Sequence, residues 1–303
     1  MNPRISVIIP VYNGASTVAD TLRALQAQIG VTDIVEVLVI DNNSTDNSVE
    51  VVRGFPVKLL QQPKPGPSAA RNAGLAAACG EIIVCLDADT LPTRRWLAEL
   101  LTPFEDPEVL IVGGTILTYN PQTAAERYCD SSGIFNPQRN VKAEVFPFAV
   151  GMNMAVRTQA LKEAGGWEEA FKWGEDIDVS QRILQRHPGS LAHAERAVIF
   201  HRNRLNLGAL AGQAWGYGRG AAIVYRRFPE TARWRIRHSI TFLVCVLGRW
   251  LNAGFAALAR ALHLMEAARA ELCYCHALWG WSFCRGFLVE YYWVRTESKS
   301  KWK

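Results

Sequence analysis

Two aspartates, one residue apart, follow a run of apolar residues that ends at Leu86. They are Asp87 and Asp89, in the sequence IIVCLDADT. Two carboxylates on one tight turn are too close to be the opposed pair of a glycosidase, unless the loop separates them. They suit a hard cation, Mg²⁺ or Mn²⁺, which takes one or two carboxylates and completes its shell with phosphate oxygens and water. The alternative is an ordinary turn, because aspartate also favours turns.

The residues around these aspartates predict alternating strands and helices. We expect strands at Ile5–Val11, Val35–Ile40, Val57–Leu60, Glu81–Leu86 and Val109–Gly114. We expect helices at Ser16–Gln28, Pro67–Cys79 and Thr93–Phe104. Strands separated by helices predict an α/β fold with a mostly parallel central sheet and right-handed crossovers.

Polar side chains follow three of these predicted strands. Tyr12 and Asn13 follow the first strand, Asp41 follows the second, and Asp87 and Asp89 follow the fourth. In parallel sheets, ligands bind beyond the carboxyl ends of the strands. A single acidic loop is usually a solvated turn, but three such clusters at one edge predict a binding site there.

Several familiar motifs are absent. The stretch DNNSTDNS that begins at Asp41 is not an EF-hand, because Asp46 stands in the place of the turn glycine and Val52 in that of the bidentate glutamate. The sequence has no G-x-G-x-x-G after the first strand and no G-x-x-x-x-G-K-[ST]. We therefore expect neither a dehydrogenase nor a P-loop enzyme. An aspartate after a strand can instead accept hydrogen bonds from a base or a ribose.

The middle of the chain is less regular. We expect a loop at Ser131–Asn140, a strand at Val145–Arg157, and a loop that leads into a helix within Glu163–His187. A further strand, Arg196–Arg204, contains His201. The acids at the start of the predicted helix, Asp176 among them, could simply complement the helix dipole.

The C-terminal region differs in charge from the rest. Residues 226–303 carry 13 Lys and Arg against 5 Asp and Glu, or +8, whereas residues 1–225 carry 20 against 23, or −3. This is not the pattern of a nucleic-acid binder, whose basic groups line a folded face. It suits a body whose tail meets an anionic surface.

Two apolar stretches in this tail, Ser239–Leu258 and Leu272–Val294, are long enough to cross a bilayer. Each contains charges that are costly at mid-membrane, such as Arg249 and Glu290. Three interpretations stay open: helices in the plane of the membrane, a spanning hairpin, and a soluble or dimer-forming cap. No oligomeric state follows from the sequence.

The first residues and the cysteines indicate the cellular compartment in which we expect the protein. The first residues, MNPRISVIIP, include no apolar signal segment, so we expect no Sec export. The seven cysteines are scattered, which favours a reducing cytosol over a disulfide framework.

The stretches SVIIPVYNGASTVADTLRALQAQ, VLVIDNNSTDNS and GPSAARNAGLAAACGEIIVCLDADT resemble the front half of an inverting family 2 glycosyltransferase with a GT-A fold. GMNMAVR, AGGWEEAFKWGEDIDVSQRI and FHRNR resemble its back half, in the family's order. The resemblance covers about residues 4–227. It implies a glycosyltransferase domain at 1–225, with a donor-nucleotide half at 1–115 and an acceptor half at 116–225, followed by a helical, membrane-associated tail at 226–303.

The resemblance also implies roles for individual residues. Asp176 would be the catalytic base, with Glu175 as the alternative. The divalent cation, Mn²⁺ or Mg²⁺, would be bound by Asp89, Asp87 and His201. The donor nucleotide would contact Pro10, Tyr12, Asn13, Asp41, Arg71, Asp87 and Ala88. The acceptor would face Gly151, Met152, Asn153, Trp167 and Glu175. Two of these residues also allow a purely structural interpretation. His201 could be a structural histidine, and Trp167 could simply pack in the core.

One departure from the family pattern is Asn42, because many members have DDGSTD where this chain has DNNSTD. It leaves the base contact of Asp41 intact and puts the finer nucleotide specificity in question. The implied activity is transfer of a sugar from a nucleotide-diphosphate donor to a glycan or lipid-linked acceptor, at the cytoplasmic side of the inner or plasma membrane, in polysaccharide or glycolipid synthesis. The alternatives are a nucleotidyltransferase that makes a sugar nucleotide, and a membrane-attached scaffold without turnover.

Overall fold

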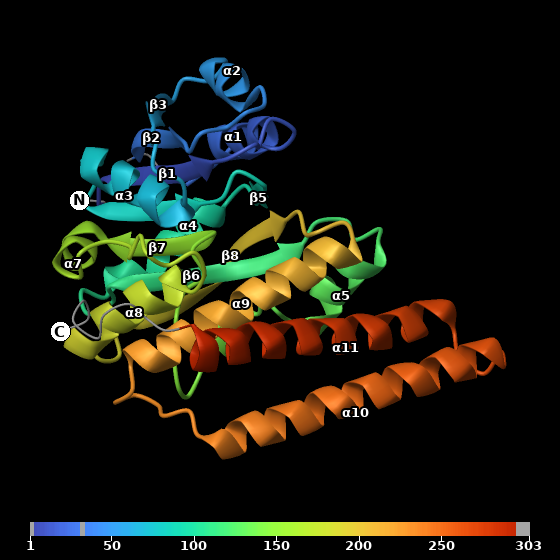
Figure 1. Ribbon diagram of the computed structural model, residues 1–303. Coiled ribbons are helices and arrows are strands. Elements are labelled where there is room, and N and C mark those ends of the chain that lie inside the picture. Colours follow the sequence, from blue (N-terminus) through green and yellow to red (C-terminus); the bar gives the residue numbers. More distant parts are fainter. Residues whose placement is uncertain (1–2, 31–33, 295–303) are drawn as a thin grey trace. The chain divides into compact units, whose positions relative to one another are not determined.

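The computed structural model describes residues 3–30 and 34–294 (Figure 1). By its internal contacts the chain divides into two compact units, one of Met1–Tyr119 with Phe135–Arg202 and one of Asn120–Ile134 with Asn203–Lys303. The boundary that we predict at residue 226 falls inside the second unit. The end of the predicted tail, residues 295–303, lies outside the described residues.

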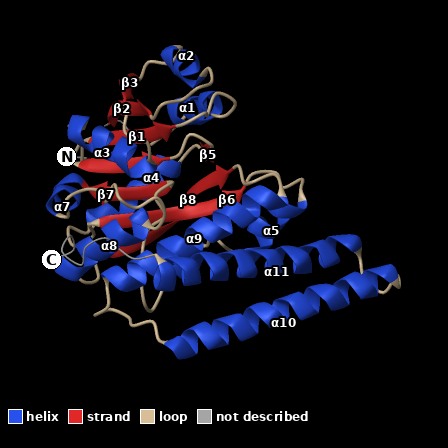
Figure 2. Ribbon diagram, in the orientation of Figure 1, coloured by secondary structure: helices blue, strands red, loops and turns tan. Residues whose placement is uncertain are grey.

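The first unit is built on a single sheet (Figure 2). Its strands are β1 (Ile5–Val11), β2 (Ile34–Asp41), β3 (Lys58–Gln61), β4 (Ile82–Leu86), β5 (Thr90–Pro92), β6 (Ile111–Thr118), β7 (Asn153–Arg157) and β8 (Leu191–His201), in the order β3-β2-β1-β4-β7-β6-β8-β5. The pairs β2–β3, β1–β2, β1–β4 and β6–β8 are parallel, as predicted. The strand β7 is antiparallel to both β4 and β6, and β5 is antiparallel to β8.

Helices cover this sheet. They are α1 (Val18–Gln26), α2 (Ser48–Arg53), α3 (Pro67–Ala77), α4 (Trp96–Leu101), η1 (Thr102–Glu105), α6 (Pro137–Val141), α7 (Thr158–Glu163) and α8 (Glu175–Arg186). One core cluster joins Ile8 of β1, Leu75 of α3 and Met154 of β7 with Leu161 of α7 and Val179 of α8. Buried apolar strands thus pack between helices, as expected for an α/β unit.

The predicted convergence of strand ends is confirmed. Strand β1 lies between β2 and β4 and is parallel to both. Val11 and Asp41, the last residues of β1 and β2, are register partners. The polar residues after β1, β2 and β4 therefore emerge at the same edge of the sheet.

The prediction is wrong for two segments in the middle of the chain. The expected loop at Ser131–Asn140 contains most of α6, which begins because the Asn136 side chain accepts a hydrogen bond from Arg139 N at 3.0 Å and Pro137 occupies the first turn. The expected strand at Val145–Arg157 is a strand only from Asn153. A turn closed by Asn153 N and Val150 O, at 2.9 Å, precedes it.

The second unit consists of helices. They are α5 (Ala124–Ser132), α9 (Leu207–Arg227), α10 (Ile236–Ala261), α11 (Ala267–Leu288) and η2 (Val289–Trp293). Helices α9 and α11 touch backbone to backbone: a Cβ added to Gly218 would lie 2.0 Å from Phe283 O, and one added to Gly286 would lie 2.1 Å from Trp215 O. The two predicted apolar stretches thus form α10 and α11.

Helix α10 has an apolar side that no described residue covers. We call it the outer face of α10, and its side chains are between 58% and 69% exposed: Ile240, Val244, Leu247, Leu251, Phe255 and Leu258. These positions recur every three or four residues, so they share one side of the helix. By length and composition α10 could cross a membrane, and it is the one such helix among the described residues.

Candidate functional site

The side chain of Arg71 joins two of the predicted motifs. Its Nη2 lies 3.0 Å from Asp87 Oδ1, in the loop after β4, and its Nη1 lies 3.1 Å from Glu175 Oε1, at the start of α8. The arginine is 4% exposed and comes from α3. Segments more than 100 residues apart in sequence therefore meet on one buried cation.

The start of α8 is acidic for a local reason as well as a chemical one. Gly174 caps the helix with φ 80°, a left-handed conformation that suits glycine. Glu175, Asp176 and Asp178 fill the first turn, where the helix dipole favours negative charge. Asp178 is buried and pairs with Arg182 at 2.7 Å. This ion pair gives Asp178 a structural role, whereas Glu175 and Asp176 lie at the site.

The charges around Arg71 shift one another's pKa values. Burial raises the pKa of Glu175 to about 7, and the Asp176 carboxylate adds to the rise while Arg71 opposes it. Burial also raises the pKa of Asp87; Arg71 opposes this rise and the Asp89 carboxylate adds to it. For Arg71, burial favours the neutral form, but Asp87 and Glu175 outweigh it and raise the pKa. The site is thus a cluster of acids that one arginine partly neutralises.

Asp176 is held by the turn before β7. Its Oδ2 accepts a hydrogen bond from the backbone N–H of Gly151 at 3.0 Å. A Cβ at position 151 would lie 3.1 Å from Nη2 of Arg71, so glycine lets the backbone approach the arginine closely. The two predicted bases, Asp176 and Glu175, and the predicted acceptor residue Gly151 are therefore neighbours in the structure.

The turn that carries Asp87 and Asp89 is fixed by two threonines, neither of which is among the predicted site residues. Thr90 donates from Oγ1 to Asp87 O at 2.7 Å. Thr21 of α1 is fully buried, and its Oγ1 lies 2.9 Å from Ala88 O and 2.7 Å from Thr90 O. A buried threonine on the apolar side of a predicted helix is the signal that could have revealed this contact.

Asp89 and His201 lie together at this turn. His201 Nε2 is 3.6 Å from Asp89 Oδ2, because β5 and β8 pair Thr90 with His201. Among the described residues no group of three His, Cys, Asp or Glu side chains gathers that could hold a metal by itself. A carboxylate and an imidazole nearby nevertheless fit a divalent cation whose remaining ligands come from a phosphate and water.

The loops after β1 and β2 are tied together. The backbone of Asn13 has φ 51°, and its Oδ1 accepts from Thr45 N at 2.7 Å. Asp41 is buried at the end of β2 and accepts from Ser44 N at 3.2 Å. Tyr12 is 65% exposed and directly follows β1, which contains Pro10. These predicted nucleotide contacts thus form one rim.

Asn42 has a structural use that an acid could not serve. Its Nδ2 donates to Gln62 O at 2.9 Å and to Lys64 O at 2.7 Å, and its Oδ1 accepts from Gly66 N at 2.7 Å. Gly66 immediately precedes α3, which carries Arg71. The amide therefore fastens the loop that leads to the central arginine, and the departure from the family pattern has a physical reason.

The predicted acceptor residues separate into two groups. Gly151 and Met152 lie in the turn beside Asp176. Asn153 is fully buried: its Oδ1 accepts from Trp96 Nε1 at 2.7 Å, and its Nδ2 donates to Thr115 O and Ala197 O. Trp167 is 2% exposed and belongs to the core cluster. The structure gives Asn153 and Trp167 supporting positions behind the site.

Sequence comparison finds relatives that match most of the chain. The family model Glycosyl transferase family 2 matches residues 6–165. Glycosyltransferase AglE of Haloferax volcanii is 30% identical over 84% of this chain and 81% of its own length. The pre-mycofactocin glycosyltransferase of Mycobacterium tuberculosis is 29% identical over 75% of this chain. The match covers 48% of that protein, so this chain spans about half its length.

Solved structures share the fold at low sequence identity. A mannosyltransferase of Pyrobaculum calidifontis, PcManGT, in complex with GDP-Man and Mn²⁺, has a TM-score of 0.67 and 21% identity, over 96% of this chain and 88% of its own. Glucosyl-3-phosphoglycerate synthase of M. tuberculosis with Mn²⁺, UDP-glucose and glycerol 3-phosphate has a TM-score of 0.53 and 19% identity, over 74% and 79%. At such identities the likeness concerns the fold.

Proposed function

Because this chain belongs to glycosyl transferase family 2, we propose that it is an inverting enzyme that moves a sugar from a nucleotide-diphosphate donor to an acceptor hydroxyl. The expected GT-A fold and the enzyme class, a glycosyltransferase, are confirmed by the family match and by the structural neighbours. The proposal concerns the inversion, the donor and the acceptor.

The position of Asp176 carries the proposal. Its carboxylate lies at the start of α8, fastened to Gly151 N, beside the Arg71 cluster that reaches the Asp87 turn. Asp176 accepts the proton of the acceptor hydroxyl, and the acceptor oxygen attacks the anomeric carbon as the nucleoside diphosphate leaves from the opposite face. One displacement inverts the anomeric centre. General-base help of this kind contributes about 10²–10⁴ in rate.

The donor side consists of the rim formed by Tyr12, Asn13 and Asp41 and the turn that carries Asp87. We assign the base to Asp41 and the diphosphate to the turn. Asp89 and His201, with Asp87, would hold Mn²⁺ or Mg²⁺, which supplies Lewis-acid stabilisation of the leaving diphosphate when bound. Support comes from the carboxylate–imidazole pair and from the structural neighbours, which were solved in complex with Mn²⁺ and a sugar nucleotide.

The acceptor side is the turn at Gly151 and Met152 together with Glu175. We propose a glycan or lipid-linked acceptor, presented at the cytoplasmic face of the membrane to which the second unit attaches. Two features support this: the net charge of +8 in residues 226–303 and the uncovered outer face of α10. A basic segment that includes an exposed apolar helix face suits an anionic membrane.

The first test is calorimetric binding of UDP, GDP, dTDP and CDP, each with and without Mn²⁺. We expect one diphosphate to bind in a metal-dependent manner, and Asp89→Ala to abolish the metal dependence. Asp130→Ala is the matched control, because Asp130 is exposed on α5. Binding of none of the four by folded protein would contradict the proposal. Release of pyrophosphate during turnover would instead identify a nucleotidyltransferase.

A further inference from the structure

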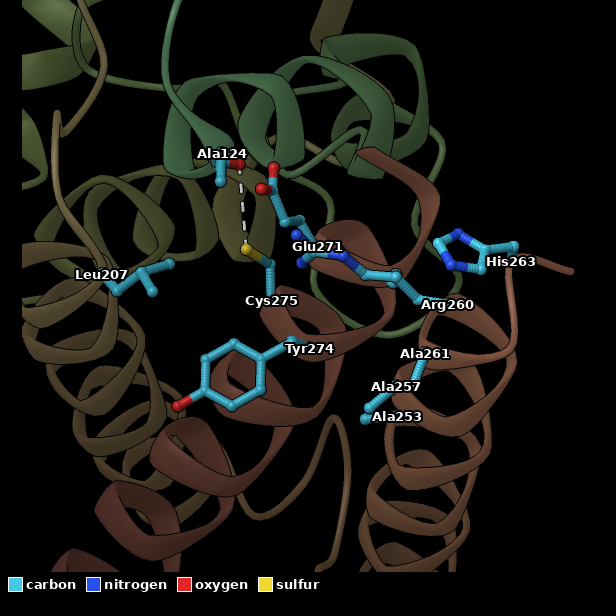
Figure 3. A pocket seen from close by; sticks show the side chains of 11 residues that line it. Ala124, Leu207, Ala253, Ala257, Arg260, Ala261, His263, Glu271, Tyr274 and Cys275 are labelled. Carbon is cyan, nitrogen blue, oxygen red and sulfur yellow. Dashed lines mark hydrogen bonds between the residues drawn. The ribbon is translucent and has the colours of Figure 1, made fainter. Parts of the chain in front are cut away.

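The second unit contains a pocket that none of the proposed steps uses (Figure 3). Its volume is ≈ 690 Å³, within the range of small-molecule sites, which is about 300–1,000 Å³. Helices α10 and α11 form two of its walls, and Ala124 of α5, Leu207 of α9 and His263, in the connection between α10 and α11, contribute the remainder. All of these residues belong to one compact unit.

The pocket exists because the walls are built from small side chains. Helix α10 presents Ala253, Ala257 and Ala261, which are four residues apart and so lie on one side of the helix. Helix α11 adds Ala270, and the ring of Tyr274 forms a larger apolar surface. The interior is therefore apolar, and it lies on a different side of α10 from the outer face.

The acidic and the basic side chain that line the pocket, Glu271 and Arg260, differ in their ion pairing. Glu271 is paired with Arg127 of α5 at 2.9 Å. The guanidinium of Arg260 makes no ion pair with any residue of the described part of the chain, and in Figure 3 it extends from α10 between the helices. An apolar cavity with one uncompensated cation complements a molecule that has an apolar chain and an anionic head.

The adjoining surface indicates where such a molecule comes from. The outer face of α10 carries six large apolar side chains, each more than half exposed, over most of the helix. Of the charged residues of α10, Arg237 precedes this face, and Arg249 and Arg260 lie off it, so nothing charged interrupts it between Ile240 and Leu258. This surface suits the acyl region of a bilayer, which places phospholipid next to the pocket.

We propose that the pocket binds an anionic phospholipid of the membrane, with one acyl chain between α10 and α11 and the phosphate on Arg260. The inference rests on the membrane attachment proposed above and is independent of the donor site. According to this proposal, the second unit binds one phospholipid as a specific ligand, in addition to contacting the surrounding bilayer.

The test uses the full-length protein on phosphatidylcholine vesicles that contain a phosphatidylglycerol with a photoactivatable group on its acyl chain. Cross-linked peptides are identified by mass spectrometry. We expect label at Tyr274 and its neighbours in the pocket, in addition to label on the outer face. Ala257→Phe fills the pocket and should lower the pocket label about tenfold, with the label on the outer face unchanged. Gly248→Phe is the matched control, because a Cβ there meets no atom within 4 Å.

The head group is tested separately. With photoactivatable phosphatidylcholine in place of phosphatidylglycerol we expect a pocket label about tenfold weaker, and Arg260→Gln should remove this difference. If Ala257→Phe does not fold, as judged by thermal unfolding, Ala261→Leu replaces it. Label confined to the outer face, or pocket label that survives both filling variants, would overturn the proposal. Nucleotide calorimetry on the same samples reports on the donor site independently.

Discussion

At the scale of single residues, Asp176 is the group on which the proposed displacement depends. Asp176→Asn keeps the size of the side chain and its hydrogen bond from Gly151 N but removes the base. We expect kcat to fall by about 10²–10⁴, with the affinity for the donor diphosphate unchanged. Rates of product formation and calorimetry measure the two effects. A loss of less than tenfold would transfer the role of base to Glu175.

Glu175 predicts a pH dependence. Its pKa is raised to about 7, so the carboxyl is protonated below that pH and forms a charged pair with Arg71 only above it. We expect kcat/KM to rise as the pH increases through about 7, because the ionised group holds Arg71 in place. Glu175→Gln is neutral at every pH, so its profile should lack this step. Glu169→Gln, at a more exposed acid paired with Lys64, should retain it.

Asn42 predicts a loss of stability. In the wild type, the Asn42 amide donates hydrogen bonds to the backbone carbonyls of Gln62 and Lys64. Asn42→Asp replaces this donor with a carboxylate, which the two carbonyl oxygens repel. We expect the free energy of unfolding to fall by about 1–3 kcal/mol at neutral pH, measured with urea. Asn43→Asp is the control, because Asn43 is exposed and bonds Pro63 O nearby. Equal losses in both variants would show that the buried amide has no special role.

The positions of the site residues were predictable to the extent that they follow strands. Asp41 and Asp87 emerge at one edge because parallel strands end there, which needs no knowledge of pairing partners. The pairing of Arg71 with Asp87 and Glu175 was not predictable, because it depends on how α3 and α8 pack. Nor was the enclosure of Asn153, a polar residue in an apolar strand, by hydrogen bonds from three directions.

At the scale of elements, periodicity located most helices and strands of the first half. It could not give the order β4-β7-β6, in which a later strand inserts antiparallel between two earlier ones, because strand pairing is a long-range property. The strand β5 was missed because it has only 3 residues and directly follows the acidic turn. These strands nevertheless position His201 beside Asp89, so the missed pairing is part of the site.

The contact between α9 and α11 gives a prediction at this scale. Gly286→Ala would place a Cβ 2.1 Å from Trp215 O, and backbone cannot yield as a side chain does. We expect the second unit to lose about 1–3 kcal/mol of stability, measured by chemical unfolding of the whole chain. Gly212→Ala in α9 is the control, since its Cβ would meet no atom within 4 Å. There the better helix propensity of alanine should stabilise by about 0.5–1 kcal/mol. A neutral Gly286→Ala would disprove this close contact.

At the scale of the whole molecule, charge and hydrophobicity are unevenly distributed along the chain. Residues 1–225 carry −3 and residues 226–303 carry +8. The sequence predicted the apolar helices of the second unit but not which of their sides are covered. Helix α11 buries many of its residues against its neighbours, while α10 leaves its outer face uncovered. For the membrane attachment that we propose, the charge of Arg249, costly in a spanning helix and away from that face, favours a helix in the plane of the membrane.

The outer face of α10 gives the last prediction. The double variant Leu247→Gln/Leu251→Gln removes two apolar side chains from the surface that we propose to enter the bilayer. Burial of each leucine contributes about 1.5–3 kcal/mol, so we expect partitioning onto phosphatidylglycerol-containing vesicles to fall at least about a hundredfold. Flotation with the vesicles measures it. Leu205→Gln is the control, because Leu205 is 65% exposed but lies outside α10. If the double variant floats like the wild type, the outer face does not enter the membrane. The soluble or dimer-forming cap then becomes the better interpretation, and the mass of the protein in solution would distinguish a second copy covering that face.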